Sequence, residues 1–69
     1  MKIKVNGEEK LIELHKSDIS LNEAVDYLGY KENTVVVELN NLIISSDRWA
    51  SKNIAEGDQL EIVSIVGGG

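Results

Sequence analysis

Apolar and polar residues alternate in the first segment of the chain, and the last segment begins with the same alternation but ends apolar on both faces. Residues 1–6 read Met-Lys-Ile-Lys-Val-Asn, and residues 60–66 read Leu-Glu-Ile-Val-Ser-Ile-Val. A period of two is typical of a strand that buries one of its faces. Residues 34–39 and 42–44 are rich in β-branched and leucine side chains, so they predict two further strands.

The first strand is expected to form a hairpin with the residues that follow it, in one of two registers. Asn6-Gly7 suits a type I′ turn, which would place Ile3 opposite Lys10. A turn centred on Gly7-Glu8, or a four-residue loop of the same parity, would place Ile3 opposite Ile12. We expect this second register because it brings two apolar residues together on the buried face.

One short helix is predicted in the middle of the chain. Ser20 and Glu23 have the spacing of a capping box. The apolar residues that follow at helical spacing form one face, consisting of Leu21, Ala24, Val25 and Leu28. Gly29 is placed to end the helix in a left-handed conformation. A helix of about two to three turns is unstable alone in water, so it must pack on the sheet.

Turn-forming residues separate the remaining elements. Asn40-Asn41 and Glu56-Gly57-Asp58 both predict tight turns, since asparagine and glycine tolerate positive φ. Ser46-Asp47-Arg48-Trp49 predicts one capped helical turn. Trp49 is the single tryptophan of a chain without phenylalanine, and we expect it in the core.

The order of these elements predicts an α+β domain. Two strands, a helix, two strands, a short turn and a final strand in 69 residues suggest one helix across a mixed sheet of about five strands. The long connection allows the first and last strands to run parallel at the sheet centre. This is the β-grasp, or ubiquitin-like, fold. We expect the domain at residues 1–66 and a flexible glycine tail at residues 67–69.

Composition excludes several classes of function. The formal net charge is −5, and the seven basic residues are scattered, so a nucleic-acid partner is not expected. No segment approaches the roughly 20 apolar residues of a membrane span, and no signal peptide is recognised. The chain has no cysteine, which fits a reducing compartment. We therefore expect a soluble, cytoplasmic protein that is monomeric when free.

The sequence contains no recognisable catalytic set. Glu13 and His15 are predicted to share a face at a strand end, but a metal site needs further ligands. The serines have no recognisable base with an orienting group, and no lysine or helix follows the glycines as a phosphate loop requires. We therefore expect no bound metal or cofactor and no enzymatic activity of the chain's own.

The last strand predicts a candidate partner interface. Val63 and Ile65 share one face and, with Ile43 or Ile44, could form an exposed apolar patch beside the tail. Such patches often mark protein interfaces. The alternative is a central strand that is buried on both faces, which would have the same pattern. The sequence favours neither interpretation.

Three glycines, Gly67-Gly68-Gly69, follow the last strand. They have no side chains to bury, and they lose more backbone freedom on ordering than other residues. Fully extended, three residues reach about 10 Å, which is enough to enter the active site of another protein. The other interpretation is a frayed end of the domain.

Several segments together resemble the sulfur carrier protein of thiamine biosynthesis, the ThiS-like family. The resemblance is most distinctive over residues 35–69, in the segments Leu39–Ile44, Asp47–Ala50, Glu56–Val63 and Val66–Gly69. The chain differs from the family pattern at Asn41, where glycine is usual. It also has three glycines where two are the shared minimum, which leaves the role of Gly67 open.

The resemblance implies a reaction at the C-terminal carboxylate. An E1-like adenylating enzyme would activate Gly69 with ATP and Mg²⁺, a sulfur donor protein would convert it to a thiocarboxylate, and thiazole synthase would take the sulfur. Gly68 would provide clearance in the partner's active site. The chain itself would be a carrier without a cofactor. The alternatives are the small subunit of molybdopterin synthase, with the same tail chemistry, and a β-grasp interaction module with an inert end.

Overall fold

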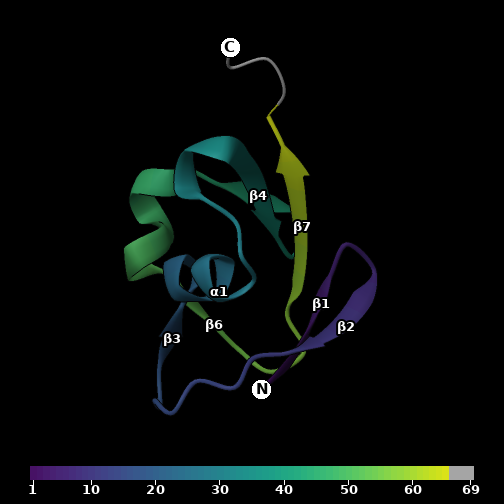
Figure 1. Cartoon of the computed structure of the whole chain (residues 1–69), viewed down its shortest axis with the longest axis vertical. Coiled ribbons are helices and arrows are strands. Elements are labelled where there is room, and N and C mark those ends of the chain that lie inside the picture. The colour runs from purple at the N-terminus through teal and green to yellow at the C-terminus, as the bar shows by residue number, and fades with distance from the viewer. Residues whose placement is uncertain (66–69) are drawn as a thin grey trace.

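A computed structural model describes residues 1–65 of the chain, in which one helix lies across one face of a five-stranded sheet (Figure 1). The strand order in the sheet is β2-β1-β7-β4-β5. These strands are β1 (Lys2–Val5), β2 (Glu8–Leu11), β4 (Val35–Leu39), β5 (Leu42–Ile44) and β7 (Gln59–Ser64). The main helix is α1 (Leu21–Tyr27).

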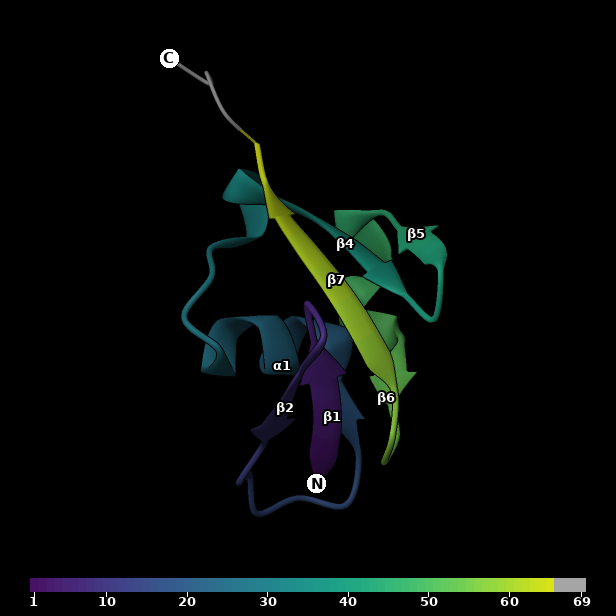
Figure 2. The same ribbon diagram turned by 90° about the vertical axis from the view of Figure 1, so that its right-hand side faces the viewer.

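The sheet has the predicted mixed topology. β1 and β7 run parallel, with Val5 opposite Leu60, whereas β7, β4 and β5 are joined by antiparallel pairing. β7 therefore lies between the first strand and the fourth, and Figure 2 shows it crossing the sheet with α1 behind. The prediction of an α+β, β-grasp domain is confirmed.

The predicted register of the first hairpin is wrong by two residues. Ile3 lies opposite Lys10, so Asn6 and Gly7 form the turn, with φ of 52° and 83° as a type I′ turn requires. The Asn6 side chain explains the choice, because its amide donates to the Ile62 carbonyl (3.1 Å) and accepts from the Ile62 N–H (2.8 Å). A shift of two keeps each side chain on its expected face, and Ile12 is buried.

The ends of α1 follow the sequence signals. The Ser20 hydroxyl accepts from the Glu23 N–H (3.1 Å), and the Glu23 carboxylate accepts from the Ser20 N–H (2.9 Å), which completes the capping box. Gly29 has a φ of 92°, and its N–H donates to the Asp26 carbonyl. The Tyr30 N–H reaches back to Val25, so the helix ends in a Schellman motif.

Three short elements were not predicted from the sequence. β3 (Ile19–Ser20) and β6 (Asn53–Ile54) form a separate two-stranded sheet, and η1 (Glu32–Thr34) is a turn of 3₁₀-helix before β4. The predicted helical turn is a 3₁₀-helix, η2 (Ser46–Ser51). These pieces are too short to produce a periodic pattern in the sequence.

The core lies between α1 and one face of the sheet. Its aliphatic members come mainly from the strands and from α1, and Trp49 belongs to the same buried cluster and is 1% exposed. The indole N–H donates to the Ile44 carbonyl (2.8 Å), so the polar atom of this large side chain is satisfied. The core position expected for Trp49 is confirmed.

Candidate functional site: the outer face of the sheet

Strand β7 is buried on one face and open on the other. Leu60 and Ile62 lie in the core, whereas Val63 is 59% exposed and Ile65 is 53% exposed. The alternative of a central strand buried on both faces is therefore wrong. The exposed apolar patch predicted at the end of this strand is present.

The strand register identifies the other members of this exposed face. Val63 lies opposite Val36, Glu61 lies opposite Glu38, and Glu38 in turn lies opposite Ile43. Side chains directly opposite each other point to the same side of a sheet. We call this side the outer face, defined by Val36, Glu38, Ile43, Glu61, Val63 and Ile65. Figure 2 views the sheet from this side, with α1 beyond it.

The two isoleucines predicted for the patch have different environments. Ile43 is 69% exposed on the outer face. Ile44 lies opposite Val37 on the inner side, is partly buried, and packs against the core. Of the two, Ile43 is thus the one that is available to a partner, while Ile44 supports β5 from beneath.

Hydrogen bonds at both sides hold β7 in place up to Ile65. Asn6 bonds to Ile62 from the β1–β2 turn, and the Ile65 N–H donates to the Thr34 carbonyl (2.8 Å). The start of β7 is fixed by Asn40, whose side chain accepts from the Gln59 N–H (3.0 Å). Val63 and Ile65 therefore lie on a segment whose backbone is held in place by hydrogen bonds. Gly67, Gly68 and Gly69 lie outside the described residues, so the roles expected of them stay predictions.

The remaining polar groups do not form a catalytic or metal site within residues 1–65. That part of the chain contains no cluster of three His, Asp or Glu side chains suited to a metal ion. β2 ends at Leu11, so Glu13 and His15 lie on an irregular segment, and their predicted position on one strand face is wrong. None of the helices in this range is long and apolar enough to cross a membrane.

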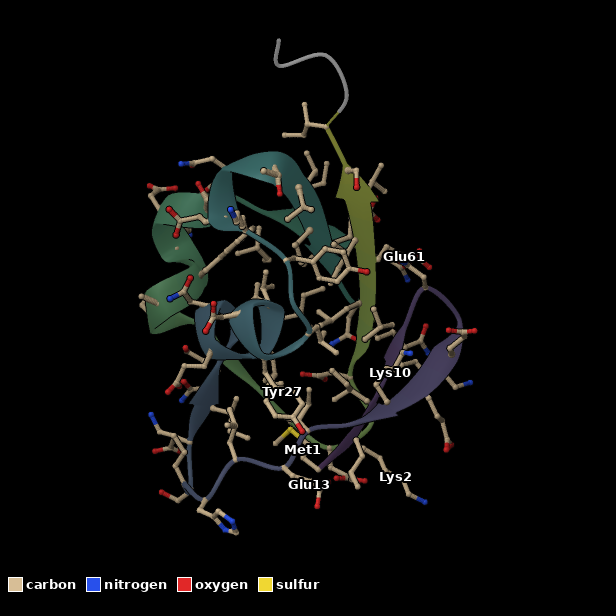
Figure 3. All side chains as sticks on the ribbon, in the orientation of Figure 1. Met1, Lys2, Lys10, Glu13, Tyr27 and Glu61 are labelled. Atoms are coloured by element: carbon tan, nitrogen blue, oxygen red, sulfur yellow. The ribbon has the colours of Figure 1, made fainter. Side chains whose placement is uncertain are left out.

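A shallow hollow of about 210 Å³ lies beside α1 and is lined by Leu14, Glu23, Asp26 and Tyr27. Glu23 already caps the helix and pairs with Lys16. The hydrogen bonds from Lys16 and then from the Ser20 backbone lower the pKa of Glu23. Tyr27 extends from α1 toward Met1 in Figure 3. The hollow lacks a nucleophile with a base, and we assign no chemistry to it.

The sequence has relatives among known proteins. The sequence model of the ThiS family matches residues 3–69. An uncharacterized protein ycf40 of Trieres chinensis is 34% identical over 65 residues, which are 94% of this chain and 85% of that protein. A thiazole synthase of Paramagnetospirillum magneticum is 33% identical over 69 residues, which are 100% of this chain but only 20% of that protein.

The fold has solved counterparts. The crystal structure of the thiamine biosynthesis protein ThiS from Geobacter metallireducens matches with a TM-score of 0.81 and 24% identity, and covers 100% of both chains. A solution structure of a thiamine biosynthesis protein from the same organism matches with a TM-score of 0.79, also at 24% identity, over 100% of this chain and 88% of that one. At this level of identity the likeness shows the shared fold.

Proposed function

The chain belongs to the ThiS family, and on this basis we propose that it carries sulfur for thiamine biosynthesis as a thiocarboxylate on Gly69. The observation that carries the proposal is the extent of the family match, which runs from residue 3 through residue 69 and so includes the glycines. The chain would be a carrier that other proteins act on, not an enzyme.

The proposed chemistry starts from an unreactive carboxylate. A carboxylate is a poor electrophile until one oxygen becomes a leaving group. An E1-like adenylating enzyme would join the Gly69 oxygen to the α-phosphorus of ATP, with Mg²⁺, and pyrophosphate would leave. Sulfur at the oxidation level of hydrosulfide, from a donor protein, would then attack the carbonyl carbon and release AMP. Gly68 has no Cβ, which would let this end enter a narrow active site.

Thiazole synthase is the proposed acceptor of the sulfur. Two thiazole synthases, from Paramagnetospirillum magneticum and Magnetococcus marinus, each contain a segment that is 33% identical to the whole of this chain. Joining a carrier to the protein that consumes its sulfur raises their effective concentration. These relatives favour the thiamine pathway over the molybdopterin alternative. ATP and Mg²⁺ would be bound by the activating partner, and this chain would bind neither.

The outer face is the proposed docking surface for the activating enzyme. Ordering a residue costs about 1–2 kcal/mol, and glycine buries almost nothing to offset that cost. The energy of docking must therefore come from the folded domain. Val63 and Ile65 supply exposed apolar area at the end of β7, next in sequence to the residues that lead to Gly69, and Ile43 adds exposed apolar area on the edge strand β5. Ile44 contributes less, because it already packs on the core.

The proposal is tested by trapping the product. The protein is incubated with the adenylating enzyme, Mg-ATP and a sulfur donor, and a thiocarboxylate-selective reagent labels the product before peptide mapping. We expect one adduct on the peptide that ends at Gly69, and no adduct when ATP is omitted. A variant that lacks Gly68 and Gly69 is the matched control. The absence of an adduct, or its persistence in the control, would overturn the carrier function.

A further inference from the structure

Asn6 is the one asparagine of the chain that a glycine follows. In any asparagine, the backbone nitrogen of the next residue can attack the side-chain carbonyl carbon, Cγ. A glycine in that next position favours the attack, because it has no Cβ to obstruct the nitrogen. All the other asparagines precede residues with side chains, and they are Asn22, Asn33, Asn40, Asn41 and Asn53. The sequence therefore makes Asn6 the asparagine most open to loss of its amide.

The reaction at Asn6 needs no reagent except water. The Gly7 nitrogen loses its proton to solvent and bonds to Cγ of Asn6, the bond from Cγ to Nδ2 breaks, and the amide leaves as ammonia with that proton. Water then opens the cyclic imide. Cleavage between the ring nitrogen and Cγ gives aspartate, whereas cleavage between that nitrogen and the backbone carbonyl carbon gives isoaspartate. No atom is oxidised or reduced, and either product adds one negative charge to a chain of formal net charge −5.

The folded domain leaves the attacking nitrogen accessible. Gly7 is exposed in the turn between β1 and β2, and a Cβ at this position would meet no atom within 4 Å. The Gly7 N–H donates to no acceptor within residues 1–65. Neither crowding nor hydrogen bonding of Gly7 therefore protects Asn6 from the reaction.

The protection comes instead from the hydrogen bonds of the Asn6 side chain. Its Nδ2 donates to the Ile62 carbonyl (3.1 Å), and its Oδ1 accepts from the Ile62 N–H (2.8 Å). The Asn6 backbone is held as well, because its N–H donates to the Leu60 carbonyl (2.9 Å). The imide ring closes only after the side chain has turned from β7 toward the Gly7 nitrogen, so both side-chain bonds must break first.

We propose that Asn6 is a deamidation site that is protected in the folded domain and reactive in the unfolded chain, and that its products cannot restore the contact with β7. Aspartate has no side-chain N–H, so a carboxylate oxygen would face the Ile62 carbonyl without a donor between them. Isoaspartate adds a carbon to the backbone of a two-residue turn, which disturbs the register that places Val5 opposite Glu8. Each episode of unfolding therefore removes some molecules from the folded population permanently.

The test compares the rate of deamidation in the folded and the unfolded protein. The wild type is incubated in mildly alkaline buffer with and without guanidinium chloride, and the tryptic peptide of residues 5–10 is followed by mass spectrometry. Methylation by a protein isoaspartyl methyltransferase counts the isoaspartate. We expect Asn6 to react before every other asparagine, and at least about tenfold faster in the denaturant, because the two bonds to Ile62 are absent there. Equal rates in the two conditions would overturn the inference.

Two variants in buffer without denaturant separate protection by folding from a property of the turn. Ile62→Ala keeps the backbone groups that bond Asn6 but opens the domain more often, so its Asn6 should react faster than that of the wild type. Val63→Ala changes an exposed side chain and should react at the rate of the wild type. The same rate in both variants would contradict protection by the fold.

The products are tested by their stability. The deamidated protein is separated by ion exchange, since it carries the additional charge, and is unfolded in urea beside Asn6→Asp. Aspartate tolerates the positive φ of this position much as asparagine does, so a lower midpoint of Asn6→Asp reports the lost donor. We expect both proteins to unfold at lower urea concentration than the wild type. A wild-type midpoint in the deamidated fraction would overturn the proposal that its products cannot restore the contact.

Discussion

Strand β7 carries similar apolar side chains on its two faces, but only one of these faces is buried. Leu60 and Ile62 are buried beneath α1, whereas Val63 and Ile65 remain open to solvent. A single helix can cover only one face of the sheet. The apolar residues of the inner face therefore account for folding, and those of the outer face are available for binding.

The largest effect on stability is expected from shortening an apolar side chain on the inner face. Ile62→Ala should lower the free energy of unfolding by about 2–5 kcal/mol, because it leaves a cavity in the core. A domain this small often has only about 3–5 kcal/mol in total, so most of the variant should be unfolded. Urea titration followed by Trp49 fluorescence measures this. Val63→Ala is the neighbouring control and should change stability by less than about 0.5 kcal/mol. Equal losses in both variants would remove the distinction between the faces.

Asn6 connects the first hairpin to β7, and its loss should have the next largest effect. Asn6→Ala removes two hydrogen bonds to Ile62 and places alanine at a φ of 52°, so stability should fall by about 2 kcal/mol. Asn6→Gly keeps the backbone conformation and loses only the side-chain bonds. The difference between their urea midpoints gives the backbone contribution. If both variants were as stable as the wild type, the hydrogen bonds between Asn6 and Ile62 would not be what holds β7 in place.

A charge on the outer face should weaken binding without unfolding the domain. Ile65→Asp should raise the Kd for the adenylating enzyme about tenfold, which corresponds to about 1.4 kcal/mol, because the carboxylate replaces apolar contact area. The Tm should stay close to that of the wild type, since Ile65 is 53% exposed. Titration calorimetry and thermal unfolding provide the two readouts. Unfolding of the variant would instead show that Ile65 belongs to the core.

The smallest effect concerns the helix that covers the inner face. The pKa of Glu23 is lowered from 4.5 by its hydrogen bonds with Lys16 and Ser20. As the pH falls, the Glu23 carboxylate therefore takes up a proton in the unfolded chain before it does so in the folded one. The stabilisation that the ionised Glu23 provides is complete above pH 4.5 and is lost as the pH falls through the folded pKa. Glu23→Gln should lose this pH dependence, whereas Glu13→Gln should keep it. Urea midpoints across the acidic range measure the difference, and parallel curves would contradict the prediction.

The sequence predicts most of the fold because its signals are local. The capping box of Ser20 and Glu23, the left-handed Gly29 and the alternation of β7 each act within a few residues. Together with the order of the elements they suffice for the β-grasp arrangement. The core position of Trp49 also follows from composition, since the chain has no other large aromatic residue except two tyrosines.

The wrong or missing predictions concern features that depend on contacts between residues far apart in the sequence. The hairpin register depends on the bonds of Asn6 to Ile62, which are 56 residues apart. Exposure of Val63 could not be deduced, because alternation shows which residues share a face and not whether anything covers that face. The position of Glu61 opposite Glu38 was missed because these residues become neighbours only through the pairing of β4 with β7. Neither strand contains a local signal that sets this pairing register.

The parallel pairing of β1 with β7 has a consequence for biosynthesis. β1 begins at Lys2 and its neighbour in the sheet begins at Gln59, so the centre of the sheet joins segments that are made early and late. A nascent chain cannot close this sheet until β7 has been synthesised, and such non-local contacts form slowly. The outer face is assembled by the same event, because its central residues come from β4 and β7. A partner that recognises this face would therefore select domains whose folding is complete.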